Sequence, residues 1–257
     1  MEILNQKIEE LSVHVFHNRE EMGTAAAHLA AEKINGIIKK NGMANIIFAA
    51  APSQNEVLSG LLKEDIDWTK VRAFHQDEYV GIEESEPAGF GNFLRRAIYD
   101  HVPLKESYYL LCREEEVPDK CREYEKLLKT YSPDLIFLGI GENGHLAFND
   151  PAAADFDDPE TIKVVELEDV CRQQQVNDGC FACFEDVPRK AVTMTMSFIQ
   201  SVPQVICCVP AGRKANAVKN ALYGPVSVAC PASILRRHPA AELYLDADSA
   251  SLILERQ

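Results

Sequence analysis

Short apolar runs alternate along this chain with longer amphipathic segments, and this alternation constrains the fold more than any other feature. In residues 18–40 the apolar side chains recur with the 3.6-residue period of a helix, and Asn41-Gly42 supplies a C-terminal stop. Further helices are predicted at residues 90–101, 119–131 and 213–222. Strands are predicted at residues 45–51, 71–74, 108–111, 135–140, 163–167, 192–196, 205–209 and 243–245.

Strands that alternate with helices of this length imply right-handed crossovers and a mainly parallel sheet with helices on both faces. The sequence therefore predicts the α/β class, as a three-layer α/β/α arrangement around a Rossmann-like sheet. No internal repeat or low-complexity linker divides the chain, so residues 1–257 are predicted to form a single domain. Ligands of such sheets bind outside the carboxyl ends of the strands. Functional side chains are therefore expected directly after strands.

The charge balance narrows the possible partners. The chain has 40 acidic and 26 basic residues, a formal net charge of -14. A field of this sign repels nucleic acid and anionic membrane surfaces. A small anionic substrate remains compatible, because a local positive pocket dominates within about 8 Å at physiological salt. The partners expected are thus small molecules, with neither nucleic acid nor membrane among them.

The compartment and the cysteine chemistry are also predicted from composition. The first residues mix glutamates into an apolar segment, unlike a signal peptide. The uncharged run 191–212 contains prolines and several polar residues, so it is predicted to be two buried strands around a turn. Eight cysteines without a framework spacing are interpreted as reduced thiols of a cytoplasmic protein. Cys180 and Cys183 form a C-x-x-C, but no second pair follows, so neither a metal nor a redox centre is expected.

A strand ending near Ile140 leads into the glycine pattern Gly139-x-Gly141-x-x-Gly144. This pattern binds a dinucleotide when its third glycine opens a helix. Here an Asp- and Pro-rich stretch follows instead, which disfavours that site. We interpret the glycines as forming a tight loop that presents polar side chains at the sheet edge. Those side chains are Asn143, His145 and Asp150, with the imidazole as acid/base; a loop histidine that only bonds its neighbours is the alternative.

Adjacent acids, Asp77 and Glu78, follow the strand predicted at 71–74. Because consecutive strand residues point to opposite faces, one carboxylate is expected to face a cleft and the other to make structural hydrogen bonds. Both acids are candidate site residues, Asp77 for catalysis and Glu78 for substrate binding. Two acids on a solvated turn are the alternative interpretation.

The loop after the strand at 45–51 contains Ser53, Gln54 and Asn55 and leads into a helix. Serine and asparagine are common helix caps, but the same backbone N–H groups also bind anions. A second strand-to-helix junction carries Arg213 and Lys214, which are either solvated or part of the site. Together the two junctions predict a phosphate pocket within an acidic protein.

Two long segments resemble one known family. FHQDEYVGI (residues 74–82) and DLIFLGIGENGHLAFNDP (residues 134–151) are similar to segments of the glucosamine-6-phosphate deaminases, also called isomerases. That family shares a fold with the 6-phosphogluconolactonases. Tyr79 and the pair Phe148-Asn149 resemble the deaminase branch, and the similarity covers nearly the whole chain.

The resemblance implies roles for several residues. It makes Asp77 the base that moves a proton between C2 and C1 of the sugar, and His145 the acid/base that opens the ring. It makes Asp150 the acidic partner of His145 and Lys214 a phosphate ligand. It implies no cofactor.

The chain departs from the family pattern at several of these positions. Asn143 stands where an aspartate is usual, and Asp150 where a glutamate is usual. The glycine- and threonine-rich phosphate loop is here Ser-Gln-Asn at 53–55. An expected arginine is absent near residue 177, and Arg172 is the candidate substitute or else a residue of the helix surface.

The implied activity is conversion of glucosamine 6-phosphate, or a close hexosamine phosphate, to fructose 6-phosphate and ammonia, through an enediol and by acid/base proton transfer. This is an aldose–ketose isomerisation with hydrolytic deamination. The alternatives are another hexose-phosphate isomerisation, lactone hydrolysis, or a sugar-phosphate sensor without catalysis, suggested by Asn143 and the altered loop. The sequence leaves a homo-oligomer open.

Overall fold

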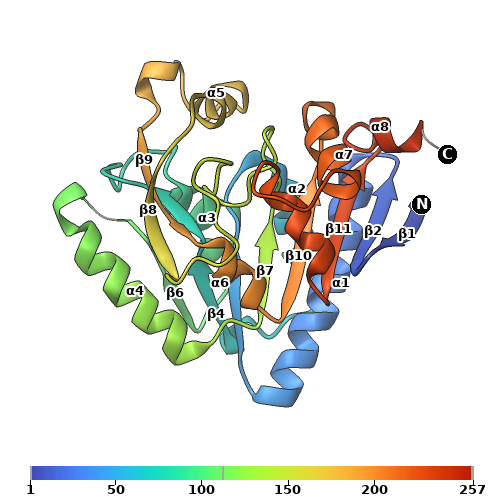
Figure 1. The fold of residues 1–257 in the computed structure, drawn as a ribbon. Helices are drawn as coiled ribbons and strands as arrows, with labels where there is room; N and C mark the ends of the chain where they lie inside the picture. The colour runs from blue at the N-terminus through green and yellow to red at the C-terminus, as the bar shows by residue number, and fades with distance from the viewer. Residues whose placement is uncertain (1, 112, 256–257) are drawn as a thin grey trace.

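The computed structural model describes residues 2–111 and 113–255. Cys112, one of the cysteines expected to be reduced, lies outside the described residues. An eight-stranded sheet runs in the order β1-β2-β11-β10-β7-β3-β4-β6 and is parallel except for the β1–β2 pair (Figure 1). Its strands are β1 (Glu2–Ile8), β2 (Leu11–Phe16), β3 (Ala44–Phe48), β4 (Val71–His75), β6 (Glu106–Tyr108), β7 (Leu135–Leu138), β10 (Gln204–Val209) and β11 (Ala241–Asp246).

Helices cover both faces of this sheet. One face packs against α1 (Arg19–Asn41), α2 (Asn55–Leu61) and α3 (Phe90–Ala97). The other packs against α4 (Val117–Tyr131), α6 (Met196–Ser201), α7 (Ala215–Tyr223) and α8 (Ser251–Leu254). Short 3-10 helices are η1 (Pro52–Gln54), η2 (Trp68–Lys70), η3 (Tyr99–His101), η4 (Glu114–Glu116), η5 (Phe184–Asp186), η6 (Gly212–Lys214) and η7 (Pro231–Arg237). None of the helices in the described ranges is both long and apolar enough to cross a bilayer.

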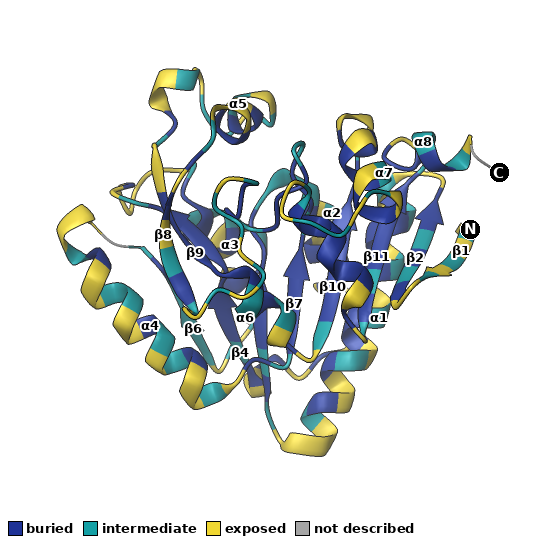
Figure 2. Cartoon of the chain, viewed as in Figure 1, coloured by how far each residue is buried: buried dark blue, intermediate teal, exposed yellow. Residues whose placement is uncertain are grey.

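Side-chain alternation along the buried strands creates the two cores. In β7, Leu135 and Phe137 belong to the core beneath α1, whereas Ile136 and Leu138 belong to the core beneath α4 and α7. All four are fully buried, as the dark central strands of Figure 2 show. A strand covered on both faces needs such a continuous apolar run. The predicted three-layer α/β/α fold with a mainly parallel sheet is confirmed.

The helix expected at 18–40 also forms as its residues dictate. Asn18 caps α1 by accepting the backbone N–H of Glu21 at 2.9 Å, and the N–H of Gly42 donates to Ile38 at the other end. The glutamates of the first turn and the lysines of the last turn complement the helix dipole.

Two predicted strands lie in a second sheet. These strands are β8 (Ile162–Glu166) and β9 (Lys190–Met194). The central strand β9 pairs antiparallel with β8 on one side and with β5 (Asp77–Tyr79) on the other. In β8 only Ile162 and Val165 are buried, and Val164 is 45% exposed. A half-exposed strand suits an antiparallel pair better than the buried parallel sheet.

Two other local expectations were wrong. The strand predicted at 108–111 ends at Tyr108, because Leu110 has left the ladder and donates its N–H to the His75 ring. The uncharged run 191–212 contains α6 between its strands rather than a turn, capped by Thr195. The two strands β1 and β2 were not predicted from the sequence.

Candidate active site

One cavity of about 240 Å³ lies at the carboxyl edge of the main sheet. Loops that follow β3, β4, β7 and β10 line it, and these four strands are neighbours in the sheet. Because parallel strands end at the same edge, residues far apart in sequence meet there. The sequence-predicted residues that line this cavity are Ser53, Gln54, Asp77, His145 and Lys214.

His145 is held by two oxygens at one ring nitrogen. Nδ1 lies 2.8 Å from Oδ1 of Asn143 and 3.0 Å from Oδ1 of Asp150. The Asn143 amide is oriented by its Nδ2, which donates to Asp150 at 2.9 Å. With two acceptors facing it, Nδ1 carries a proton. In the neutral ring Nε2 is then the basic nitrogen.

The glycine pattern serves this histidine. A Cβ atom on Gly141 would lie 2.1–2.3 Å from three atoms of the His145 ring. Gly144 has φ +88°, a left-handed conformation, and a Cβ there would lie 2.7 Å from Cys230 Sγ. No helix follows in residues 139–151. The loop therefore seats an imidazole rather than opening a pyrophosphate-binding helix.

Asp150 is an ionised partner within this loop. Burial alone raises its pKa, but the hydrogen bond and charge of His145, together with the Asn143 amide, outweigh it and leave the pKa below its usual value. Its second oxygen accepts the backbone N–H of Glu168 at 3.1 Å. Although one methylene shorter than the usual glutamate, Asp150 reaches the imidazole.

The two adjacent acids separate as expected. Glu78 accepts backbone N–H groups from Tyr79, Phe90 and Gly91 at 2.9–3.0 Å. Asp77 lines the cavity, is 5% exposed, and accepts no hydrogen bond from the described residues. Burial and the charge of Glu78 raise the pKa of Asp77 well above its ordinary value. Burial also raises the pKa of Glu78 to about 7, although the three N–H groups act in the opposite direction. The structural role expected for one acid falls to Glu78, so its inclusion as a substrate ligand is corrected.

The cationic end of the cavity is Lys214. It is 6% exposed and forms no ion pair with a described carboxylate, while its neighbour Arg213 pairs with Asp178 at 2.8 Å. Burial lowers the pKa of Lys214, and the negative charges of Asp178 and Glu142 act against that shift. Lys214 thus offers a positive charge to a ligand.

The turn that leads to Lys214 has a strained backbone. Ala211, a non-glycine residue, has φ +82°, and its N–H donates to both oxygens of buried Asp246 at 3.0–3.1 Å. On the opposite side Nε2 of Gln54 lies 3.3 Å from the carbonyl oxygens of Leu138 and Cys208, joining the ends of β7 and β10. Both loops are held by contacts behind the cavity.

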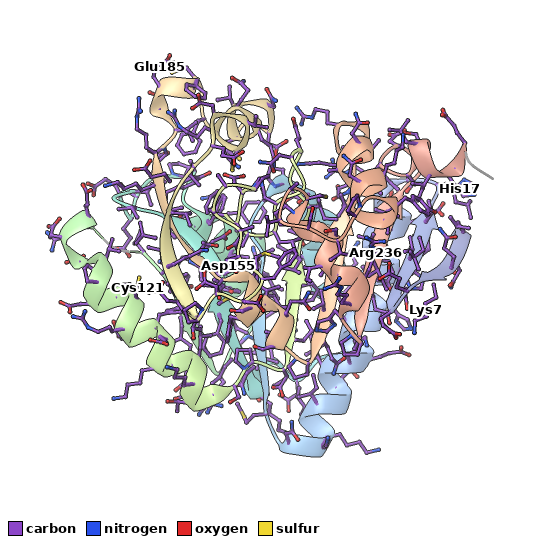
Figure 3. All side chains as sticks on the ribbon, in the orientation of Figure 1. Lys7, His17, Cys121, Asp155, Glu185 and Arg236 are labelled. Atoms are coloured by element: carbon purple, nitrogen blue, oxygen red, sulfur yellow. The ribbon has the colours of Figure 1, made fainter. Side chains whose placement is uncertain are left out.

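Two residues that were predicted to bind the phosphate, Asn55 and Arg172, are not among the residues that line the cavity. Asn55 is exposed at the first position of α2. Arg172 belongs to α5 (Asp169–Asn177), and its guanidinium donates to the carbonyls of Phe184 and Val187 at 2.9 Å while lying over the Phe184 ring. Arg172 thus fixes the segment whose outer tip carries Glu185, labelled in Figure 3. Its guanidinium is committed to this segment, so its assignment to phosphate is corrected.

Sequence reasoning missed several polar side chains of the cavity wall. Arg19 lines it and donates to the Pro52 carbonyl at 3.0 Å and to Glu56 at 2.9 Å, which positions the turn at Ser53. Gln76 and Gln175 also line it. The only signal for Gln76 was its place beside Asp77, and a run of three glutamines gave no indication of which one faces inward.

A metal is the one further ligand type these residues suggest. The ligand atoms of His145, Asp150 and Cys171 lie within 4.8 Å of one another, a trio of zinc-ligand types. However, Nδ1 of His145 already faces two oxygens. Burial also raises the pKa of the Cys171 thiol well above its ordinary value, which disfavours the thiolate a metal requires. The trio therefore fits a hydrogen-bonded histidine better than a metal centre.

Comparison with known proteins agrees with this geometry. The family described as glucosamine-6-phosphate isomerases/6-phosphogluconolactonase matches residues 17–244. Glucosamine-6-phosphate deaminases of Bacillus thuringiensis (strain Al Hakam) and Bacillus cereus (strain AH820) are each 32% identical over 245 residues, covering 95% of this chain and 90% of their own.

Solved structures show the same fold. A monomeric glucosamine-6-phosphate deaminase matches with a TM-score of 0.85 and 27% identity, covering 93% of this chain and 99% of its own. The 6-phosphogluconolactonase of Trypanosoma brucei matches with a TM-score of 0.76 and 17% identity over 97% and 100%, a likeness of fold alone. From the match over residues 17–244 and the 32% identity of the deaminases, this chain belongs to the glucosamine-6-phosphate isomerase/6-phosphogluconolactonase family.

Proposed function

We propose that this protein converts glucosamine 6-phosphate and water to fructose 6-phosphate and ammonia. The observation that carries the proposal is that Asp77 and His145 line one cavity with Lys214. A carboxylate, an imidazole and a cation are what an aldose–ketose shift on a sugar phosphate requires. The relatives that share 32% identity with the chain are named as deaminases of this substrate.

Ring opening is assigned to His145. The proton of the C1 hydroxyl leaves, the C1–O5 bond breaks, and O5 receives a proton. Since Nδ1 holds its proton against Asn143 and Asp150, Nε2 accepts and returns the transferred one. The Asp150 carboxylate stabilises the imidazolium that forms in between.

Isomerisation is assigned to Asp77. Its carboxylate removes the C2 proton while the ammonium group of the substrate gives a proton to O1, so that an enediol-type intermediate forms with an amino group at C2. The proton on Asp77 is then returned to C1, which leaves an iminium at C2. Water adds to that carbon and ammonia departs, so the atoms balance as fructose 6-phosphate. The raised pKa of Asp77 makes its carboxylate a stronger base than an exposed aspartate.

The phosphate is assigned to Lys214 and the turn at Ser53. Lys214 is a buried cation without an ion-pair partner among the described carboxylates, and Ser53 adds a hydroxyl donor from the facing loop. Fixing the phosphate at one end places C1 and C2 near Asp77 at the other.

Asn143 is a weaker argument for a sugar-phosphate sensor without catalysis than the sequence suggests. Asn143 cannot supply charge to the imidazole, but Asp150 lies 3.0 Å from the same nitrogen and supplies it. Asn143 retains a hydrogen bond to the ring at 2.8 Å. The acid/base group is therefore complete without an aspartate at position 143.

Ammonia release from glucosamine 6-phosphate tests the proposal. We expect turnover by the wild-type protein together with stoichiometric fructose 6-phosphate. Hydrolysis of 6-phosphogluconolactone without ammonia release would instead identify a lactonase. Binding of the sugar phosphate without any turnover would identify a sensor.

We also propose a compartment, the cytoplasm. The cysteine spacing supports the cytoplasm, and the described cysteines are free thiols. One structural relative is described as monomeric. A homo-oligomer stays a prediction, which the mass of the protein in solution tests.

A further inference from the structure

Two glutamines of the cavity wall have no part in the mechanism above. Gln76 is 2% exposed and Gln175 is 5% exposed, and both line the cavity. None of the described residues forms a hydrogen bond with either side-chain amide. The amide atoms of both side chains remain accessible to solvent. Because both residues line the cavity, we infer that the amides face it.

Other buried glutamines of the same wall are bound. Gln174 accepts the N–H of Glu142 at 2.9 Å through Oε1 and lies 3.3 Å from Asp178 through Nε2. Gln54 bonds two strand-end carbonyls through its own Nε2. Buried polar groups normally have such partners, because desolvating an amide without one is unfavourable. The unused amides of Gln76 and Gln175 therefore point to a ligand.

The two amides lie toward different ends of the cavity. Gln76 directly precedes Asp77, the proposed base, in the link between β4 and β5. Gln175 lies in the last turn of α5, three residues before Asp178, which caps the helix. The Asp178 carboxylate pairs with Arg213 at 2.8 Å, and Arg213 directly precedes Lys214. Gln175 is thus on the cationic side, and Gln76 on the side of the reacting carbons.

We propose that Gln76 and Gln175 are substrate ligands, with Gln76 binding a sugar hydroxyl and Gln175 donating to the phosphate beside Lys214. This assignment rests on the function proposed above. An amide both donates and accepts, as a hydroxyl does, whereas an ionised phosphate only accepts. Gln175 therefore donates to the phosphate through Nε2. The anion subsite thus combines the Lys214 cation with neutral hydrogen-bond donors.

Calorimetry with two probes separates the two roles. Inorganic phosphate reports the anion subsite alone, and glucitol 6-phosphate, an open-chain analogue without a carbonyl, reports the whole cavity. We expect Gln175→Leu to weaken both probes roughly 5- to 10-fold. Gln76→Leu should weaken glucitol 6-phosphate by a similar factor and leave inorganic phosphate unchanged.

The same helix provides the matched control. Gln173 is exposed on α5, and its one side-chain partner among the described residues is the Asn177 side chain at 3.2 Å. Gln173→Leu should change neither affinity by more than about twofold. If a leucine variant fails to fold, Gln175→Glu keeps the shape and adds a negative charge, and it should weaken phosphate by more than tenfold.

Several results would overturn the assignment. These are an unchanged phosphate affinity in folded Gln175→Leu or Gln175→Glu, an unchanged glucitol 6-phosphate affinity in Gln76→Leu, and a wild-type protein that binds neither probe. If the wild-type protein binds both probes with these dependences but releases no ammonia, the proposed reaction fails while the ligand assignment stands.

Discussion

The imidazole of His145 and the carboxylate of Asp150 meet at 3.0 Å, although Asp150 is one methylene shorter than the residue usual in the family. The loop from Gly141 to Asp150 makes this possible by turning back on itself, with Gly141 donating its N–H to the His145 carbonyl. The pair supplies the charge that Asn143 lacks. Its importance can be measured by neutral substitution.

Asp150→Asn should reduce kcat by about 100-fold or more while KM changes little, since the amide retains a hydrogen bond but cannot stabilise imidazolium. Steady-state ammonia release measures both constants. The matched variant Asn143→Asp adds a second carboxylate beside Nδ1 and should retain turnover. An Asp150→Asn enzyme with near wild-type kcat would show that Asp150 only shapes the loop.

Gly141→Ala should remove most activity, because the added Cβ would overlap the His145 ring at 2.1–2.3 Å and displace it. We expect a loss of at least 100-fold in kcat. The matched control is Gly36→Ala in α1, where nothing lies within 4 Å of the added Cβ. That variant should keep full activity and gain about 0.5–1 kcal/mol of stability. Equal activities of the two variants would contradict the seating of His145 on Gly141.

Asp77→Asn should stabilise the fold at neutral pH. Because the pKa of Asp77 is raised in the folded state, the free energy of unfolding falls as pH rises from 3.8 through the folded value. Replacing the carboxylate removes that penalty, by about 1 to 2 kcal/mol at pH 8. Denaturant unfolding at pH 8 and pH 4 measures it. The gain should vanish at pH 4, and a variant less stable than wild type at pH 8 would contradict the buried charge.

The pH dependence of kcat/KM should also report Asp77, because kcat/KM follows the ionising groups of the free enzyme. Its rising limb is expected well above the ordinary aspartate value, since burial and Glu78 both raise the pKa. Glu78→Gln removes one of these causes, so the limb should move to lower pH. A separate titration of the free sugar phosphate gives the contribution of the substrate to the profile of kcat/KM. A rising limb near pH 4 in the wild-type enzyme would contradict a raised pKa of Asp77.

Most of the site could be predicted because it follows from topology. Residues directly after parallel strands must meet at one sheet edge, which is why Ser53, Asp77, His145 and Lys214 share a cavity. The alternation of strand side chains likewise separated Asp77 from Glu78. These inferences need only strand order and direction.

What the sequence could not show depends on how one helix packs. The α5 segment places Val170 in solvent and buries Arg172 and Gln175, so its polarity does not reveal its inner face. The guanidinium of Arg172 is committed to the carbonyls of residues 184 and 187, a long-range contact. Similarly, the strands at 162–166 and 190–194 resemble members of the main sheet, and only their pairing with each other and of the second with β5 shows that they form a separate sheet.

Exchange of the C2 hydrogen tests the central claim most directly. With glucosamine 6-phosphate deuterated at C2, wild-type protein should release or transfer the label at the rate of turnover. Asp77→Asn should slow that process at least 1000-fold while still binding inorganic phosphate. Label loss that continues undiminished in folded Asp77→Asn would show that a different group removes the proton, and the mechanism built on Asp77 and His145 would be wrong.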